Sequence, residues 1–293
     1  MRLYTIEFRE QEYVALECAD GRLCPVVCLG VEAATMNALI DQADTVLPVL
    51  KEAAVKPAAE QVLSFAPEEV RILSPIPSLR QDMICLGVNY DEHIRETVHV
   101  EDFQHKEATV YFSKRAYRVS GPEDPIPEYD FVDSLDYEVE LGVVIGKTVK
   151  GCSVEEARKS IFGYSVVNDV SGRNLQFKHK QWYMGKGQDG YTVMGPCIVT
   201  ADEIPDPQNL SIVCRVNGEV RQSSNTRYMI QPVAEAIAEL AQGITLIPGT
   251  VIATGTPGGV ALGMKEPKWL HEGDVVECEV EKIGILTNPV KKA

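Results

Sequence analysis

The chain has 293 residues, of which 45% are hydrophobic and 24% are charged, and its formal net charge at pH 7 is −15. These values are ordinary for a globular enzyme, and the negative charge argues against nucleic-acid or anionic-membrane partners, which need basic patches. No stretch approaches the roughly 20 apolar residues of a membrane span. The N-terminus reads as a strand rather than a signal peptide, so we expect a cytoplasmic protein.

Residues 1–75 read as a small α+β N-terminal domain that precedes a larger domain over residues 76–293. Strand candidates at residues 3–8, 13–18 and 23–29 are separated by turn signals. A helical pattern follows at about residues 34–53, and Pro48 is expected to kink it. The Ser-Pro-Ile-Pro segment at 74–77 is typical of an extended linker between the two domains.

Beyond residue 83, strand patterns broken by glycine and proline dominate the chain. Two helices stand out: one begins at a capping box, Ser153 with Glu156, and ends before Gly163, and the other covers about residues 232–242. The polar stretch at 97–107 reads as a loop. The larger domain is therefore rich in strands and poor in helices.

The segment at 85–96 carries a candidate base. A strand ends at Gly87, and Asn89 is positioned to cap a short helical turn that carries His93 and Glu96 on one face. A carboxylate bonded to one imidazole nitrogen fixes the tautomer, which is what a water-activating base needs. On spacing alone, a simple pair on the surface of a helix is the more common interpretation.

Two glutamates, Glu138 and Glu140, lie two residues apart in the otherwise apolar strand at 136–146. Strand side chains alternate, so both carboxylates point to the same face, where they repel each other and resist burial. A hard divalent cation such as Mg²⁺ or Mn²⁺ removes both penalties. A solvated outer face is the alternative that this pattern leaves open.

Three further patterns fit such a site, although each also has a bland interpretation. Asp169 ends another strand pattern and could supply a third oxygen ligand, or it could be a turn residue. Lys186 lies between glycines, where the backbone can approach a ligand, or it belongs to a flexible turn. The segment at 253–260 could be a tight turn or a backbone nest for an anion.

Taken together, these segments resemble the fumarylacetoacetate hydrolase family over roughly residues 70–290. The shared motifs are G-x-N-Y-x-x-H-x-x-E at 87–96, YFSK at 111–114, DYE-x-EL at 136–141, NDVS-x-R-x-x-Q at 168–176, GK-x-x-D at 185–189, NT before MI at 225–230, and TGTPGGV at 254–260. Several ordered motifs in one chain make the resemblance specific.

The resemblance implies an α+β fold whose catalytic domain is a layered, rolled mixed β-sheet, and homodimers are common in the family. It implies that Mg²⁺ or Mn²⁺ is bound by Glu138, Glu140 and Asp169. The catalytic residues would be His93, Glu96 and Lys186. A small anionic 2-oxo acid would be held by Lys114, Arg173, Asp189 and Thr256.

The family includes hydrolases of acylpyruvates and 2,4-dioxo acids, oxaloacetate decarboxylases, and decarboxylase/isomerases of dienoic diacids. Because His93 and Glu96 supply a complete water-activating pair, we expect hydrolysis of a C–C bond in a 2,4-dioxo acid or acylpyruvate. Oxaloacetate decarboxylation, or the decarboxylation and isomerisation of a dienedioate, is the alternative reaction. A metal-stabilised binding module is the alternative without catalysis.

Overall fold

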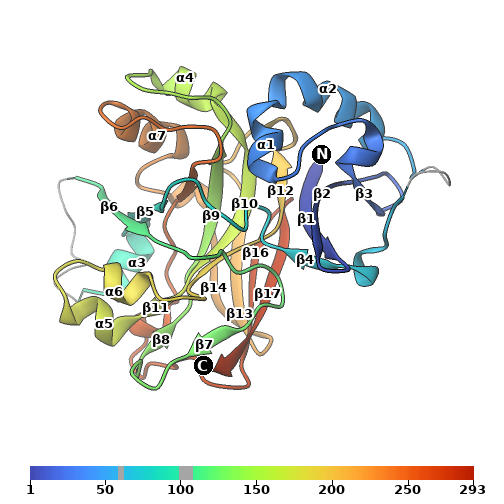
Figure 1. Ribbon diagram of the computed structural model, residues 1–293. Coiled ribbons are helices and arrows are strands. Elements are labelled where there is room, and N and C mark those ends of the chain that lie inside the picture. The colour runs from blue at the N-terminus through green and yellow to red at the C-terminus, as the bar shows by residue number, and fades with distance from the viewer. Residues whose placement is uncertain (59–62, 99–107) are drawn as a thin grey trace.

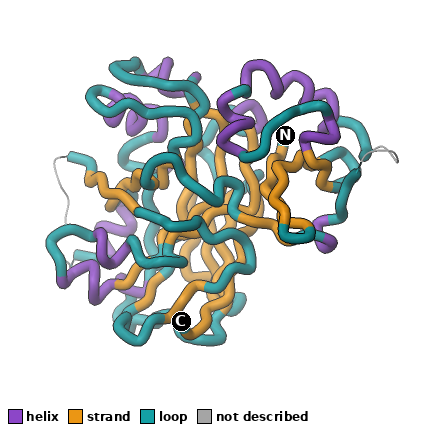
Figure 2. The backbone as a smooth tube through the Cα atoms, in the orientation of Figure 1, coloured by secondary structure: helices purple, strands orange, loops and turns teal. Residues whose placement is uncertain are grey.

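The computed structural model describes residues 1–58, 63–98 and 108–293. Strands form the centre of the molecule and helices lie at its periphery (Figures 1 and 2). Within these residues the strands make one ten-stranded sheet, one five-stranded sheet and one two-stranded ribbon.

The ten-stranded sheet contains strands from residues 1–75 and strands from the larger domain. Its strands are, in spatial order, β3 (Leu23–Pro25), β2 (Gln11–Glu17), β1 (Arg2–Phe8), β12 (Thr192–Thr200), β10 (Ile161–Asp169), β9 (Val139–Ile145), β15 (Val251–Ala253), β5 (Met83–Gly87) and β6 (Val110–Lys114), with β4 (Arg71–Leu73) paired to β1. The β15–β5 pair is parallel and the other pairs are antiparallel, so the sheet is mixed. The β1–β12 pair links residues 1–75 directly to the sheet of the larger domain.

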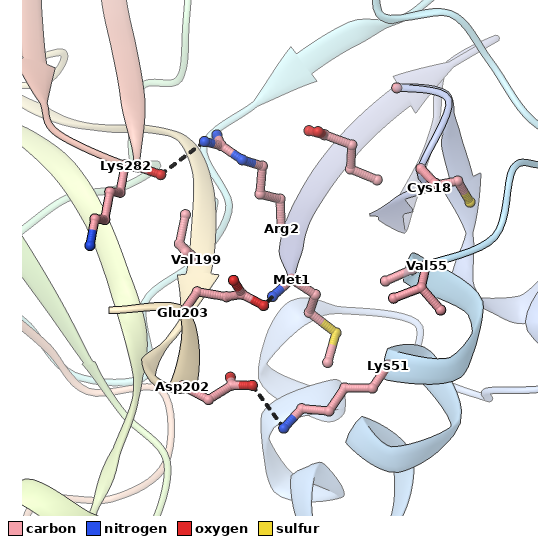
Figure 3. Close-up of a pocket in the computed structure, with 13 residues that line it drawn as sticks. Met1, Arg2, Cys18, Lys51, Val55, Val199, Asp202, Glu203 and Lys282 are labelled. Atoms are coloured by element: carbon pink, nitrogen blue, oxygen red, sulfur yellow. Dashed lines mark hydrogen bonds and ion pairs between the residues drawn. The ribbon is translucent and has the colours of Figure 1, made fainter. Parts of the chain in front are cut away.

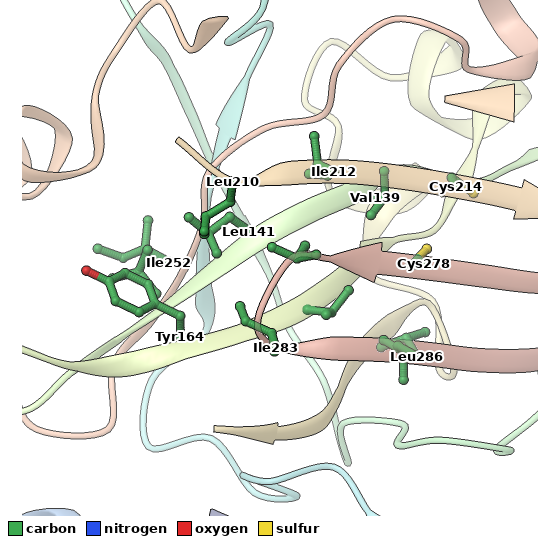
Figure 4. Close-up of a cluster of buried hydrophobic side chains, with 14 of the residues drawn as sticks. Val139, Leu141, Tyr164, Leu210, Ile212, Cys214, Ile252, Cys278, Ile283 and Leu286 are labelled. Atoms are coloured by element: carbon green, nitrogen blue, oxygen red, sulfur yellow. The ribbon is translucent and has the colours of Figure 1, made fainter. Parts of the chain in front are cut away.

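A second, five-stranded sheet packs across the first. It contains β14 (Glu219–Asn225), β13 (Ser211–Val216), β16 (Val275–Val280), β17 (Gly284–Lys292) and β7 (Ile126–Glu128), and the short ribbon pairs β11 (Ser171–Gly172) with β8 (Leu135–Asp136). Figure 4 shows apolar side chains of both sheets meeting between them, among them Leu141 from β9, Ile212 from β13 and Leu286 from β17. All three are fully buried, so this interface is the main core.

The helices are short and lie around the sheets. They are α1 (Met36–Asp41), α2 (Ala43–Ala54), α3 (Asp91–Glu96), α4 (Val154–Lys159), α5 (Arg173–Lys178), α6 (Tyr183–Lys186) and α7 (Val233–Ala241). Single 3₁₀ turns occur at Val26–Leu29, Pro67–Glu69, Ala201–Glu203, Thr226–Tyr228 and Ala261–Gly263. Helices α1 and α2 lie beside β1–β3 (Figure 1), and their apolar residues form a second core cluster with Val144 and Val167 of the large sheet.

These findings confirm the α+β fold with layered mixed sheets, the expected helix with its capping box, α4, and the second expected helix, α7. The single helix expected at 34–53 is divided at Gln42 into α1 and α2; Pro48 lies inside α2, and the kink expected there stays a prediction. Gln42 leaves helical geometry at φ −103°, and its amide donates to the carbonyls of Glu32 and Ala38, so this side chain ends α1. The strand expected at 23–29 ends at Pro25, where a 3₁₀ turn begins.

Three further expectations from the sequence concern the loop at 97–107, membrane-spanning helices and the division at residue 75. Most of the loop expected at 97–107 lies outside the described residues, which end at 98 and resume at 108. In the described part of the chain, no helix is both long and apolar enough to cross a bilayer. The division at residue 75 stays a proposal.

The close packing of β10 against β12 can be tested by adding a methyl group at Gly163. A Cβ added to Gly163 would lie 2.4 Å from the carbonyl oxygen of Val199, a backbone atom that cannot easily move. Gly163→Ala should therefore lower the free energy of unfolding by about 1–3 kcal/mol or more, measured by urea denaturation.

Gly243→Ala is the matched control, because a Cβ there meets no atom within 4 Å. It should change the free energy of unfolding by less than about 0.5 kcal/mol. Equal effects of the two substitutions would contradict the packing argument.

Candidate functional site

Three buried carboxylates from two neighbouring strands form the centre of the candidate site. Glu138 directly precedes β9, Glu140 lies within it, and Asp169 ends β10. One carboxylate oxygen from each residue lies within 4.8 Å of the other two. The alternation of side chains along β9 thus puts both glutamates on one face, whereas Val139 and Leu141 face the main core.

Three buried cationic side chains surround two of these carboxylates. The Lys186 ammonium donates to Glu138 Oε2 at 2.7 Å and to Asp169 Oδ2 at 2.8 Å. Arg173 donates to Glu138 Oε1 at 2.6 Å, and Lys114 donates to Asp169 Oδ1. Lys114 also donates to the carbonyls of residues 170 and 191, so all three of its N–H bonds are used. The charges of Glu138 and Asp169 are therefore offset, and their side chains held in place, by these three cationic residues.

Glu140 differs from its two neighbours. Its Oε2 accepts a hydrogen bond of 2.7 Å from the Gly255 amide, but among the described residues it has no salt-bridge partner. Burial, followed by the charges of Asp169 and Glu138, raises its pKa well above the usual range. Burial would also raise the pKa of Glu138, but Lys186 and Arg173 outweigh burial and lower it. The protein's own cations thus leave one buried carboxylate uncompensated.

The His93–Glu96 pair expected from the sequence is present on α3. His93 Nδ1 lies 2.9 Å from Glu96 Oε1, and Glu96 Oε2 accepts a 2.6 Å hydrogen bond from the Gly259 amide. With the Glu96 carboxylate as acceptor, a neutral imidazole has its proton on Nδ1 and its lone pair on Nε2. Asn89 does not cap α3 as expected, because Tyr90 is the cap residue and the Asn89 amide instead donates to the Thr254 carbonyl at 2.8 Å.

The turn at 254–260 serves both groups. The Gly255 amide binds Glu140 and the Gly259 amide binds Glu96, so one segment fixes a carboxylate of the cluster and the orienting residue of the histidine. Both glycines have positive φ, +91° and +107°. A Cβ on Gly259 would lie 2.0 Å from the Arg221 carbonyl oxygen, so only glycine fits there.

One small cavity, of about 10 Å³, connects these groups. Its lining includes the expected residues His93, Glu138, Glu140, Lys186 and Thr256, and apolar walls from Phe112 and Trp182. Asp169 touches the same cluster through its carboxylate. Lys114 and Arg173 lie behind the carboxylates, where they bind the ligand candidates rather than line the cavity. Asp189 is exposed, outside this lining, and its carbonyl accepts from Tyr129.

Two residues of the site were given no role by sequence reasoning. Asp136 accepts from Arg173 Nε at 2.9 Å and from the amides of Ala261 and Leu262, so it anchors the arginine. Gln176 lines the cavity, is fully buried, and has an Nε2 without a hydrogen-bond partner in the described residues. The three-residue spacing from Arg173, whose Nη1 donates to Gln176 Oε1, was the available signal for Gln176.

A larger cavity, of about 900 Å³, lies elsewhere, between the start of β1, the end of α2 and the end of β12 (Figure 3). Four of its charged groups are already paired with each other: Lys51 with Asp202 at 2.9 Å, and the Met1 ammonium with Glu203 at 3.0 Å. Such mutual pairing presents no convergent set of groups for chemistry, so we place the candidate site at the carboxylate cluster.

The donor set fits a hard divalent cation. All three candidate ligands are carboxylates, which suit Mg²⁺ or Mn²⁺, and they are buried, where the excess negative charge on Glu140 is costly. A bound cation would offset that charge. The identity of the ion remains a prediction.

Comparison with known proteins gives consistent matches. The family model described as fumarylacetoacetate (FAA) hydrolase, C-terminal, matches residues 82–291. The chain is 40% identical over 259 residues to "Oxaloacetate tautomerase FAHD2A, mitochondrial" of Bos taurus, covering 87% of this chain and 79% of the relative. Among solved structures it is similar to a fumarylacetoacetate hydrolase from Exiguobacterium antarcticum, with a TM-score of 0.84, 35% identity and full coverage of both chains.

It is also similar to a maleylpyruvate hydrolase from Sphingobium sp. SYK-6 in complex with manganese(II) and pyruvate, with a TM-score of 0.80, 25% identity and full coverage of both chains.

Glu138 has cationic partners and Glu140 has none among the described residues, and this difference can be tested by substitution. In EDTA, Glu138→Gln should lower the free energy of unfolding by about 3–5 kcal/mol, because it breaks buried pairs with Arg173 and Lys186. Glu140→Gln should instead raise it, because it removes a buried carboxyl that lacks a counter-ion and whose pKa is raised in the folded state, so folding no longer carries the cost of burying or protonating it. Urea denaturation measures both, and a loss of stability in Glu140→Gln would contradict the charge assignment.

Proposed function

The chain belongs to the fumarylacetoacetate hydrolase family, and we propose that it is a divalent-cation-dependent enzyme that interconverts the keto and enol forms of oxaloacetate or a closely related 2-oxo diacid. The observation that carries the proposal is that a histidine–glutamate pair, a lysine and three clustered carboxylates border one small cavity. The relative of Bos taurus, named as an oxaloacetate tautomerase, favours this reaction over the C–C hydrolysis expected from the sequence.

Glu138, Glu140 and Asp169 would hold the cation, Mg²⁺ or Mn²⁺. When bound, the ion would supply positive charge for the carboxylate and keto oxygens of a 2-oxo acid, where negative charge develops during enolisation. The chain has a net charge of −15 and would otherwise repel an anionic substrate, so local positive charge from the ion and the buried cationic side chains is needed to attract it.

Keto–enol exchange moves two protons: one leaves C3 of the keto form and one is added to the oxygen on C2. In our proposal, His93 Nε2 takes the C3 proton, while Glu96 holds Nδ1 and stabilises the resulting imidazolium. The Lys186 ammonium, which borders the same cavity, donates toward the C2 oxygen. The unpartnered Nε2 of Gln176 is placed to bind a substrate oxygen.

Hydrolysis of a C–C bond in a 2,4-dioxo acid or acylpyruvate is the second candidate. The complete His93–Glu96 pair favours it, because the same lone pair could deprotonate a water, and the maleylpyruvate hydrolase neighbour supports it. Oxaloacetate decarboxylation needs only the charge around the C2 oxygen and is a third outcome.

Three broader expectations stay predictions. The first is a cytoplasmic location, which is not established because the Bos taurus relative is mitochondrial by name. The second is a homodimer. The third is substrate binding by Lys114, Arg173, Asp189 and Thr256.

A single assay series separates the reactions. In the first assay, the protein with Mg²⁺ is given oxaloacetate; the enol is followed by ultraviolet absorbance, and CO₂ release is measured in parallel. In the second assay, the protein with Mg²⁺ is given acetylpyruvate, and pyruvate release is measured. We expect enol–keto exchange to have the highest kcat/KM and to disappear in EDTA. Acetylpyruvate cleavage with the highest kcat/KM would favour the hydrolase, and full activity in EDTA would reject the cation.

Removal of the base tests its role. His93→Ala should lower kcat/KM for enol–keto exchange by about 10²–10⁴-fold, as is typical of general acid–base catalysis. Affinity for Mn²⁺, measured by electron paramagnetic resonance, should stay within a few-fold of the wild type, because His93 is not a ligand candidate. A rate within a few-fold of the wild type would mean that another group is the base.

A further inference from the structure

Strand β9 has an unusual edge next to the carboxylate cluster. Strand β15 pairs with β9 from Val144 to Gly142 and then ends at Ala253. From Leu141 back to Val139, which lies between the two glutamates, no strand in the described residues continues this edge. Buried peptide groups need hydrogen-bond partners, so other groups must replace the missing strand.

Side chains and the turn at 254–260 supply those partners. The amide and hydroxyl of Thr254 donate to the Leu141 carbonyl, at 3.2 and 2.8 Å. The Thr256 hydroxyl donates to the Val139 carbonyl at 2.9 Å. The Val139 amide donates to Gln222 Oε1 at 3.1 Å. A single glutamine thus satisfies the amide between Glu138 and Glu140.

Gln222 also closes a ring of hydrogen bonds. Its Nε2 donates to Thr256 Oγ1 at 2.7 Å and to the Pro257 carbonyl at 2.9 Å, and Thr256 in turn donates to Val139. Gln222 is fully buried and comes from β14, in the five-stranded sheet. It therefore braces the two sheets and the turn against one another at the strand that carries the carboxylates.

We infer that Gln222 is a positioning residue for the cation site: it holds the end of β9 and the turn at 254–260 in register, and so sets the distances between Glu138, Glu140 and Asp169. It touches none of the three carboxylates, so its effect is transmitted through the peptide of Val139 and through Thr256. The same brace fixes the turn whose amides bind Glu140 and Glu96. This inference rests on the proposed function, because it presupposes that the carboxylates bind a divalent cation.

The test is the dissociation constant for Mn²⁺, measured by electron paramagnetic resonance on the purified full chain. Gln222→Met keeps the length of the side chain but removes the acceptor and the donors. We expect it to weaken Mn²⁺ binding by about tenfold or more, as loss of outer-shell support does elsewhere, and to broaden the Mn²⁺ spectrum through uneven ligand positions. Gln222→Asn, which is too short to span the ring, should act alike and serves if the methionine variant does not fold.

Gln208→Met is the matched control. Gln208 also uses its amide to brace backbone, since it accepts from the Val233 amide at 2.8 Å and donates to the Thr226 carbonyl at 3.2 Å, but it is not part of the site. It should lower the midpoint of thermal unfolding and leave the Mn²⁺ dissociation constant within a factor of two.

The outcomes separate the two proposals. If the wild type binds no Mn²⁺, both the proposed function and this inference fail. If the wild type binds Mn²⁺ and the Gln222 variants bind it as tightly, the proposed function stands and the positioning role is rejected. Equal weakening in Gln208→Met would show that general loss of stability, rather than positioning, lowers the affinity, and would also reject the inference.

Discussion

Three buried carboxylates, each with one oxygen within 4.8 Å of the other two, impose the constraint on which the rest of the structure depends. Like charges so close, and removed from water, are strongly unfavourable unless cations offset them. Lys114, Arg173 and Lys186 offset Glu138 and Asp169, but not Glu140. The arrangement is therefore built for one more positive charge, and the fold bears a cost in stability to keep the place for it.

The two sheets explain how that cost is carried. Strand β9 presents Val139 and Leu141 to the core between the sheets, where both are fully buried, and the glutamates to the opposite face. Apolar burial on one face of the strand thus stabilises the position of charges on the other. The polar ring through Gln222 and Thr256 then fixes the strand end where β15 stops. Packing supplies the stability and the hydrogen bonds supply the geometry.

Much of the site could be predicted from the sequence because its signals are local. Glu138 and Glu140 follow from strand alternation, and the His93–Glu96 pair follows from helical spacing. Asp169 could be joined to them only through the family resemblance, since its neighbour across the sheet is set by the pairing of β10 with β9. The roles of Gln222 and Asp136 carried no local signal, because the partners that define them, Val139 and Arg173, lie more than 30 residues away. The end of α1 was also missed, because the Gln42 side chain decides it, and Asn89 was wrongly expected to cap α3, because its side chain binds the Thr254 carbonyl instead.

The pairing of β1 with β12 has a consequence for any shortened form of the chain. Only two residue pairs, Arg2 with Val199 and Leu3 with Ile198, join these strands, yet they cover the C-terminal end of one edge of the long apolar strand β12. A chain cut after residue 75 would expose that edge, with its unpaired amides and carbonyls, to other copies of itself. Self-association through added strands, rather than loss of the carboxylate cluster, would then be the first sign that the N-terminal segment shields the sheet.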